Sequence, residues 1–78
     1  MAFSPKRNQI NPNKLLLSKW TAIEPINKRK HFIVIELLRD PDTEEVTGCM
    51  IEAVIDKYQM QINWKDLKNA EVWRLGWK

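Results

Sequence analysis

The sequence predicts a mainly β fold, a small and partly open barrel of five mostly antiparallel strands. The chain has 78 residues, of which 44% are hydrophobic, and this is enough for one thin core. Five segments alternate apolar and polar residues or are rich in β-branched residues, and turn-forming residues separate them. Closing such strands into a barrel removes exposed sheet edges, and we therefore favour a barrel over a flat sheet.

The N-terminal part divides into an arm and the start of a domain. Residues 1–10 are mainly polar or basic, so we expect a flexible basic arm. Residues 11–78 then form a single small barrel-like domain. Asn11 can cap a helix that has Pro12 at its first position. We expect a short helix or turn over residues 12–18 that packs a leucine onto the core.

Two strands joined by a basic turn follow. Residues 19–23 form the first strand, which we expect Pro25 to end. Residues 27–30 form the turn, and residues 31–39 form a second strand rich in Ile and Val. Apart from one glutamate, this second strand is apolar on both faces, which is typical of a strand covered on both sides.

An acidic loop leads into the second half of the domain. The sequence DPDT at residues 40–43 has turn chemistry and begins a hairpin loop that runs to Glu45. Residues 46–56 form the third strand, in which Gly48 indicates a bulge. Residues 58–64 alternate apolar and amide side chains without a break, which predicts a half-buried fourth strand.

One helical turn precedes the last strand. Residues 65–71 resemble a helical turn, and residues 72–78 return to alternation. A helical turn in this place is common in Src-homology-3-like barrels, so the predicted barrel is of that kind, although a fold analogy indicates no function. The alternative is an α+β fold in which residues 64–73 form a true helix.

The charge is unevenly distributed along the chain. Residues 1–31 carry a net charge of +6, residues 32–63 carry −5, and residues 64–78 carry +2. Basic ends around an acidic middle favour an anionic partner for the basic part. The simpler interpretation is a solvated surface of mixed charge.

The composition excludes most kinds of catalytic and metal site. One cysteine, Cys49, and one histidine, His31, cannot form a disulfide framework, a Cys-rich zinc module or a His pair. Cys49 lies on an apolar strand face, as a buried and inert thiol does. Glu36 and Glu52 could form a carboxylate pair, but contact with a cation or water explains them more simply. We expect no catalytic residue, no cofactor and no metal.

Targeting and membrane segments are not evident. The longest apolar run, residues 32–38, is interrupted by a glutamate and is far shorter than the ~20 residues of a membrane span. The first residues lack the apolar stretch of a signal peptide. With an unpaired cysteine, these features predict a cytoplasmic protein without membrane contact.

Four tryptophans are too many for the centre of so small a core. Trp64 continues the apolar face of the fourth strand, so we expect it in the core. Of Trp20, Trp73 and Trp77, we expect one or two to be partly exposed. An exposed indole beside cations can stack on unpaired bases, while the cations attract phosphates.

These observations predict a non-enzymatic binding module for nucleic acid that is single-stranded or is RNA, with a basic-aromatic face. The predicted binding residues are Lys19, Trp20, Lys28, Arg29, Lys30, His31, Arg74 and Trp77. The alternative is a protein-interaction module or accessory subunit that docks through exposed tryptophans, in which the acidic loop also has a use. A third option is self-association through an open edge strand, and we expect a monomer or a weak homodimer.

Two stretches resemble a known family. Residues 11–22 (NPNKLLLSKWTA), with Pro25 and residues 30–32 (KHF), resemble the opening motif of a family of small tryptophan-rich bacterial proteins. Residues 64–73 (WKDLKNAEVW) and 76–78 (GWK) resemble its closing motif. The family has no established activity. The resemblance implies a bacterial cytoplasmic protein and supplies no catalytic residue.

Overall fold

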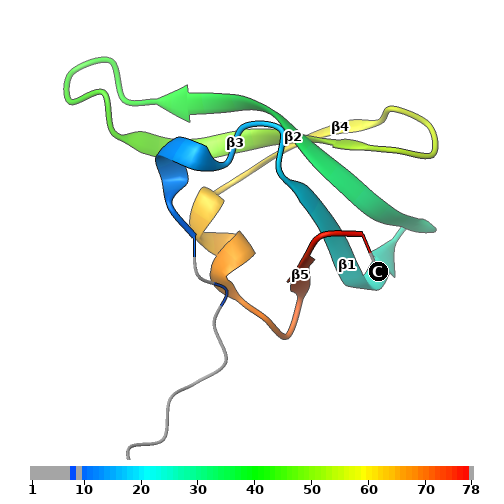
Figure 1. The fold of residues 1–78 in the computed structure, drawn as a ribbon. Helices are drawn as coiled ribbons and strands as arrows, with labels where there is room; N and C mark the ends of the chain where they lie inside the picture. The colour runs from blue at the N-terminus through cyan, green and yellow to red at the C-terminus, as the bar shows by residue number, and fades with distance from the viewer. Residues whose placement is uncertain (1–7, 9, 78) are drawn as a thin grey trace, which may run out of the picture.

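A computed structural model describes residues 8 and 10–77 of the chain as one antiparallel sheet with two short 3-10 turns (Figure 1). In chain order the elements are η1 (Pro12–Lys14), β1 (Lys19–Ile26), β2 (Arg29–Arg39), β3 (Val46–Ala53), β4 (Gln59–Ile62), η2 (Trp64–Lys68) and β5 (Trp73–Leu75). The strand order is β4-β3-β2-β1-β5. The edge strands β4 and β5 do not pair with each other, so the sheet is not closed. The mainly β, five-stranded prediction is confirmed.

The helical alternative for residues 64–73 is wrong. Within this segment, η2 covers five residues and is a 3-10 turn, not an α-helix. Asn63 caps it, because its side-chain oxygen accepts a hydrogen bond from the Lys65 amide at 3.0 Å. The backbone then leads into β5, as expected for one helical turn before the last strand.

The β1–β2 hairpin is longer than predicted. Asn27 and Lys28 form a tight turn with φ values of 50° and 68°, and Ile26 lies opposite Arg29. Left-handed backbone at both central residues is the requirement of a type I′ hairpin turn. Pro25 does not end β1, because the register with β2 shifts between Thr21 and Ile26, and a ladder interrupted there tolerates a residue without an N–H.

The strand β2 is covered fully on only one face. Phe32 and Val34 are buried, whereas Ile33 and Ile35 are half-buried. The register with β3 shifts between Val34 and Glu36, which marks an irregularity of the β-bulge type. The expected cover on both faces is therefore incomplete, since one sheet without a second layer buries only one side of its strands.

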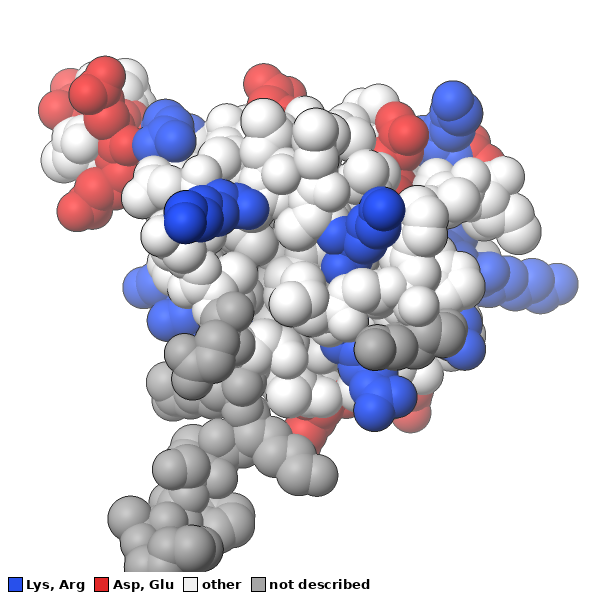
Figure 2. All heavy atoms as spheres, in the orientation of Figure 1, with Lys and Arg blue, Asp and Glu red and all other residues white. Residues whose placement is uncertain are grey.

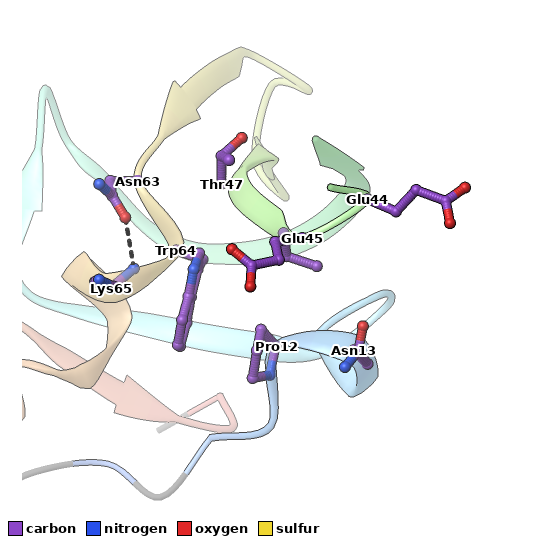
Figure 3. Close-up of a pocket in the computed structure, with 9 residues that line it drawn as sticks. Pro12, Asn13, Glu44, Glu45, Thr47, Asn63, Trp64 and Lys65 are labelled. Carbon is purple, nitrogen blue, oxygen red and sulfur yellow. Dashed lines mark hydrogen bonds between the residues drawn. The ribbon is translucent and has the colours of Figure 1, made fainter. Parts of the chain in front are cut away.

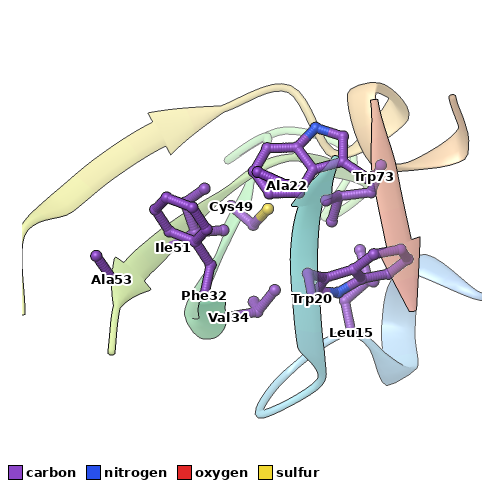
Figure 4. Close-up of a cluster of buried hydrophobic side chains, with 10 residues drawn as sticks. Leu15, Trp20, Ala22, Phe32, Val34, Cys49, Ile51, Ala53 and Trp73 are labelled. Atoms are coloured by element: carbon purple, nitrogen blue, oxygen red, sulfur yellow. The ribbon is translucent and has the colours of Figure 1, made fainter. Parts of the chain in front are cut away.

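The core gathers on the concave side of the sheet (Figure 4). Its members are Leu15, Trp20, Ala22, Phe32, Val34, Cys49, Ile51, Ala53, Leu67 and Trp73. The ring centres of Phe32 and Trp73 lie 5.5 Å apart in an edge-to-face arrangement. The two turns complete the core, because Leu15 follows η1 and Leu67 belongs to η2, which contacts both β3 and β5.

Asn8 and Ile10, which lie within the predicted arm, contact the domain. The Asn8 side-chain amide donates hydrogen bonds to the carbonyls of Leu67 at 2.7 Å and Trp73 at 2.9 Å. Its backbone N–H donates to the Lys68 carbonyl at 3.0 Å, and Ile10 packs against the core. Asn8 therefore ties η2 to β5. The rest of the predicted arm, residues 1–7 and 9, lies outside the described residues.

We predict that Gly48→Ala destabilises the fold. A Cβ at this position would lie 2.9 Å from the Ile62 carbonyl oxygen, so β4 must move away from β3. We expect a loss of about 1–3 kcal/mol in the free energy of unfolding, measured by urea denaturation. Gln61→Ala, at an exposed position on β4, is the control. A Gly48→Ala variant as stable as the control would contradict this account.

Candidate functional site

The outer face of the sheet carries a row of polar and basic residues across β5, β1 and β2. Because Trp20 and Ala22 point into the core, their neighbours Lys19 and Thr21 point outward. Thr21 lies opposite Arg74 on β5 and opposite His31 on β2. The register therefore brings together residues from the two ends of the chain.

The C-terminal segment folds back onto this row. Gly76 has a φ of 85°, a conformation that favours glycine, and its N–H donates to the Lys19 carbonyl at 2.7 Å. The Thr21 hydroxyl donates to the Gly76 carbonyl at 2.7 Å. Thr21 is consequently only 2% exposed although it lies on the outer face. This turn directs Trp77 toward β1 and β2.

Trp77 presents a fixed and accessible indole. Its Nε1–H donates to the Phe32 carbonyl at 3.1 Å, while the residue remains 44% exposed. The Lys19 Nζ lies 5.0 Å from the ring centre, within cation–π range. The His31 ring centre lies 6.2 Å away at an interplanar angle of 53°. The polar atom of the indole is thus satisfied, and part of its surface faces solvent.

We call Lys19, His31, Arg74 and Trp77 the basic-aromatic face. Four of the eight residues predicted from the sequence meet here, from β1, β2, β5 and the C-terminal segment. The sequence analysis did not identify Thr21 and Gly76, which hold this arrangement. The sequence signal that could have indicated the turn at Gly76 is a glycine directly before a tryptophan at the end of a strand.

Trp20, which was predicted as a binding residue, does not lie on the basic-aromatic face. Trp20 is fully buried, and its Nε1–H donates to the Ser18 hydroxyl at 2.8 Å, so it offers no surface to a ligand. Trp73 is also in the core. Of Trp20, Trp73 and Trp77, only Trp77 is exposed, in agreement with the expectation that one or two of them would be. Trp64, expected in the core, is half-buried and packs against the core from η2.

The three cations of the β1–β2 hairpin do not act alike. Arg29 forms an ion pair with Asp56, with 2.9 Å between Nη2 and Oδ2, and its Nε donates to both carboxylate oxygens. The Arg29 guanidinium also lies 4.1 Å from the ring centre of Tyr58. Its charge is therefore compensated. Lys28 and Lys30 are exposed near the hairpin turn, apart from the basic-aromatic face.

Negative charge is concentrated elsewhere. Figure 2 shows carboxylates gathered on the projecting loop at upper left, which Figure 1 identifies as the β2–β3 loop with Asp40, Asp42, Glu44 and Glu45. Glu36 lies opposite Met50 in the sheet, and Glu52 lies opposite Ile33. The two strand glutamates therefore do not face each other.

The described residues contain no group of three or more metal-ligating side chains. Burial raises the pKa of the Cys49 thiol to about 11, with a further contribution from the negative charge of Asp66. A thiol with this pKa is protonated at neutral pH and is a poor nucleophile. Cys49 therefore acts as a small apolar residue of the core.

Comparison with known proteins identifies one family. Residues 18–78 match the family model described as "Tryptophan-rich protein (DUF2389)". No curated protein and no solved structure matches the chain. In the part of the chain that the structure describes, no helix has the length and apolar character to cross a membrane.

We predict that the Arg29–Asp56 pair makes stability depend on pH in acid. The hydrogen bond from Arg29 lowers the pKa of Asp56 below its usual 3.8, while desolvation acts in the opposite direction. A lowered folded-state pKa gives stability that is present above pH 3.8 and lost as the pH falls through the folded value. Asp56→Asn should therefore reduce stability at pH 7, and the difference from wild type should shrink in acid.

Urea denaturation of both proteins across this pH range measures the effect. Glu24→Gln, an exposed carboxylate on β1, is the control for loss of one negative charge. A difference between wild type and Asp56→Asn that stays constant with pH would refute the assignment.

Proposed function

Since the chain belongs to the tryptophan-rich protein family DUF2389, which is described by composition and not by activity, we propose its function from the geometry of the basic-aromatic face. The proposed function is non-enzymatic binding of single-stranded nucleic acid, RNA or DNA, in the cytoplasm. The observation that carries it is the exposed Trp77 ring, held beside Lys19 and His31.

The Trp77 indole can stack on a base but does not distinguish one base from another. Its N–H is already bonded to the Phe32 carbonyl, so only the π surface is available to a base. Stacking on an aromatic ring is tolerant of sequence, because every base has a π face. A ligand with unpaired bases is required, since bases within a duplex are stacked on one another. We therefore expect preference for single strands with weak sequence discrimination.

The cations supply attraction to phosphates. Lys19 and Arg74 are exposed on the same face as Trp77, and Lys28 and Lys30 extend the positive charge toward the hairpin turn. Arg29 is left out of the proposed site, because its guanidinium is held by Asp56. Trp20 is left out because it is buried. The acidic β2–β3 loop lies at the opposite end of β2 from the β1–β2 turn, where it does not oppose the approach of phosphates.

A second candidate is docking of a protein partner on the same side of the molecule. Ile23 and Val72 are exposed apolar residues at adjacent positions, and the Ile23 N–H donates to the Val72 carbonyl at 2.8 Å. These two residues and the exposed Trp77 ring are apolar surfaces that a protein partner can contact. Nuclease treatment separates the candidates, because a complex that survives it and is lost in Trp77→Ala indicates a protein partner.

We predict that binding of a mixed single-stranded oligonucleotide depends on salt through Lys19 and Arg74. Each cation that contacts one phosphate contributes about 0.7 to the slope of log affinity against log salt for single strands. Lys19→Gln combined with Arg74→Gln should reduce that slope by about 1.4. Fluorescence anisotropy at several salt concentrations measures it. Lys65→Gln, on η2, is the control, and an equal effect in that variant would contradict the assignment.

We also predict that Trp77 contributes stacking energy. Trp77→Ala should weaken binding of the same oligonucleotide by about 1–3 kcal/mol, the usual contribution of one stacked base. Trp64→Phe, a half-buried tryptophan on another surface, should leave the affinity unchanged. Circular dichroism of both variants verifies the fold. Equal affinity of Trp77→Ala and wild type would remove the indole from the site.

A further inference from the structure

A groove of about 660 Å³ lies on another part of the surface, where η1, η2 and the start of β3 meet (Figure 3). The residues that matter for its chemistry are Pro12, Asn13, Glu45, Thr47 and Trp64. None of them belongs to the basic-aromatic face. The groove is open to solvent, so it suits a protruding side chain better than an enclosed small molecule.

Trp64 gives the groove an aromatic wall. In Figure 3 its indole stands across from the Pro12 ring, and the two rings border the space between η2 and η1. The indole already accepts one cation, because the Lys68 Nζ lies 4.9 Å from its ring centre. Lys68 is not part of the groove lining. The ring thus already lies within cation–π distance of one ammonium, and another part of its surface borders the groove.

Glu45 gives the groove a negative charge. Its carboxylate turns toward the space between Trp64 and Pro12 in Figure 3, whereas the Glu44 side chain points away. Among the described residues the only ion pair joins Arg29 and Asp56, so Glu45 forms no ion pair with a described cation, although Lys65 also lines the groove. A carboxylate beside an indole is the combination that binds an organic cation.

The wall that carries Glu45 is held in place. The Arg39 Nη1 donates to the Glu44 carbonyl at 3.0 Å and to the Asn13 side-chain oxygen at 3.3 Å. These bonds join the β2–β3 loop to η1. Because this nitrogen donates to a backbone oxygen and an amide oxygen, Arg39 joins the walls of the groove without an ion pair to the Glu45 carboxylate. Lys65 is the one cation in the lining.

We propose that this groove binds an arginine side chain of a basic protein partner. A planar guanidinium can lie against the Trp64 ring and donate two parallel hydrogen bonds to Glu45. Arginine fits better than nucleic acid, since a phosphate would meet the negative charge of Glu45. The site is independent of the basic-aromatic face, and it stands whether or not the protein binds nucleic acid.

The test is a titration of the ¹⁵N-labelled full chain with an acetylated pentapeptide that has one central arginine. We expect saturable shifts of the Trp64 indole N–H and of the Glu45 and Thr47 amides. The dissociation constant for one side chain should be on the order of 1 mM. The same peptide with citrulline, which keeps the shape but has no charge, should not produce them. Shifts centred on Trp77, or equal binding of the citrulline peptide, would overturn the proposal.

Two variants test the residues. Glu45→Gln should weaken binding of the arginine peptide by about two- to fivefold, as expected for one partly exposed ion pair. Glu24→Gln removes an exposed charge from β1 and should have no effect. Unchanged affinity in Glu45→Gln would refute the role of the carboxylate.

A second copy of this chain is the other partner that could occupy the groove, and it must also be tested. Sedimentation velocity at two protein concentrations decides this, and we expect the same mass for wild type and Glu45→Gln. Association that depends on concentration and disappears in Glu45→Gln would show that the groove belongs to an interface between copies, and it would overturn the assignment to a basic partner.

Discussion

The pairing of Trp20 with Phe32 in the β1–β2 hairpin is the constraint on which the rest of the structure depends. Both side chains are fully buried, and side chains on a strand alternate between the two faces of a sheet. Once Trp20 points inward, Lys19 and Thr21 must point outward, and so must His31 beside Phe32. A slip of one residue would place Lys19 in the core and Trp20 in solvent, so burial of the indole fixes the register and the outer face together.

The same register determines where the C-terminal residues lie. The edge strand β5 pairs with β1 over the segment that contains Trp20, which sets Trp73 against Phe32 in the core and Arg74 beside Thr21 on the outside. Gly76 then allows the chain to return over β1, and the indole of the next residue reaches the Phe32 carbonyl. The exposed Trp77 is therefore held by the backbone carbonyl of Phe32, the residue whose side chain lies in the core. Core packing and surface geometry are coupled through β2.

Sequence periodicity predicted the five strands and the two short turns, because these depend on local alternation and turn chemistry. The number of tryptophans, set against the size of the core, predicted that one or two of Trp20, Trp73 and Trp77 would be partly exposed. Periodicity did not reveal which of two adjacent residues faces the core. Trp20 was grouped with Lys19 because they are neighbours, although alternation puts neighbours on opposite faces. Arg29 was predicted to be available to a ligand, but its partner Asp56 lies 27 residues away and only the tertiary fold brings them together. The groove around Trp64 was missed for the same reason, since its walls come from three separate segments.

The four tryptophans have two kinds of role. Trp20 and Trp73 are buried and stabilise a core that a single short sheet could not otherwise fill, whereas Trp64 is half-buried and Trp77 is exposed. A lysine lies over the ring of each of these two, but only Trp64 also borders a carboxylate. Trp77 has Lys19 beside it, and Trp64 faces Glu45 across the groove. Under the two proposals, the charge beside each indole selects the ligand: the cations of the basic-aromatic face would disfavour a basic peptide, and Glu45 would disfavour a phosphate in the groove. A domain of this size could in this way hold a nucleic acid and a basic protein at the same time without either ligand competing for the other's site.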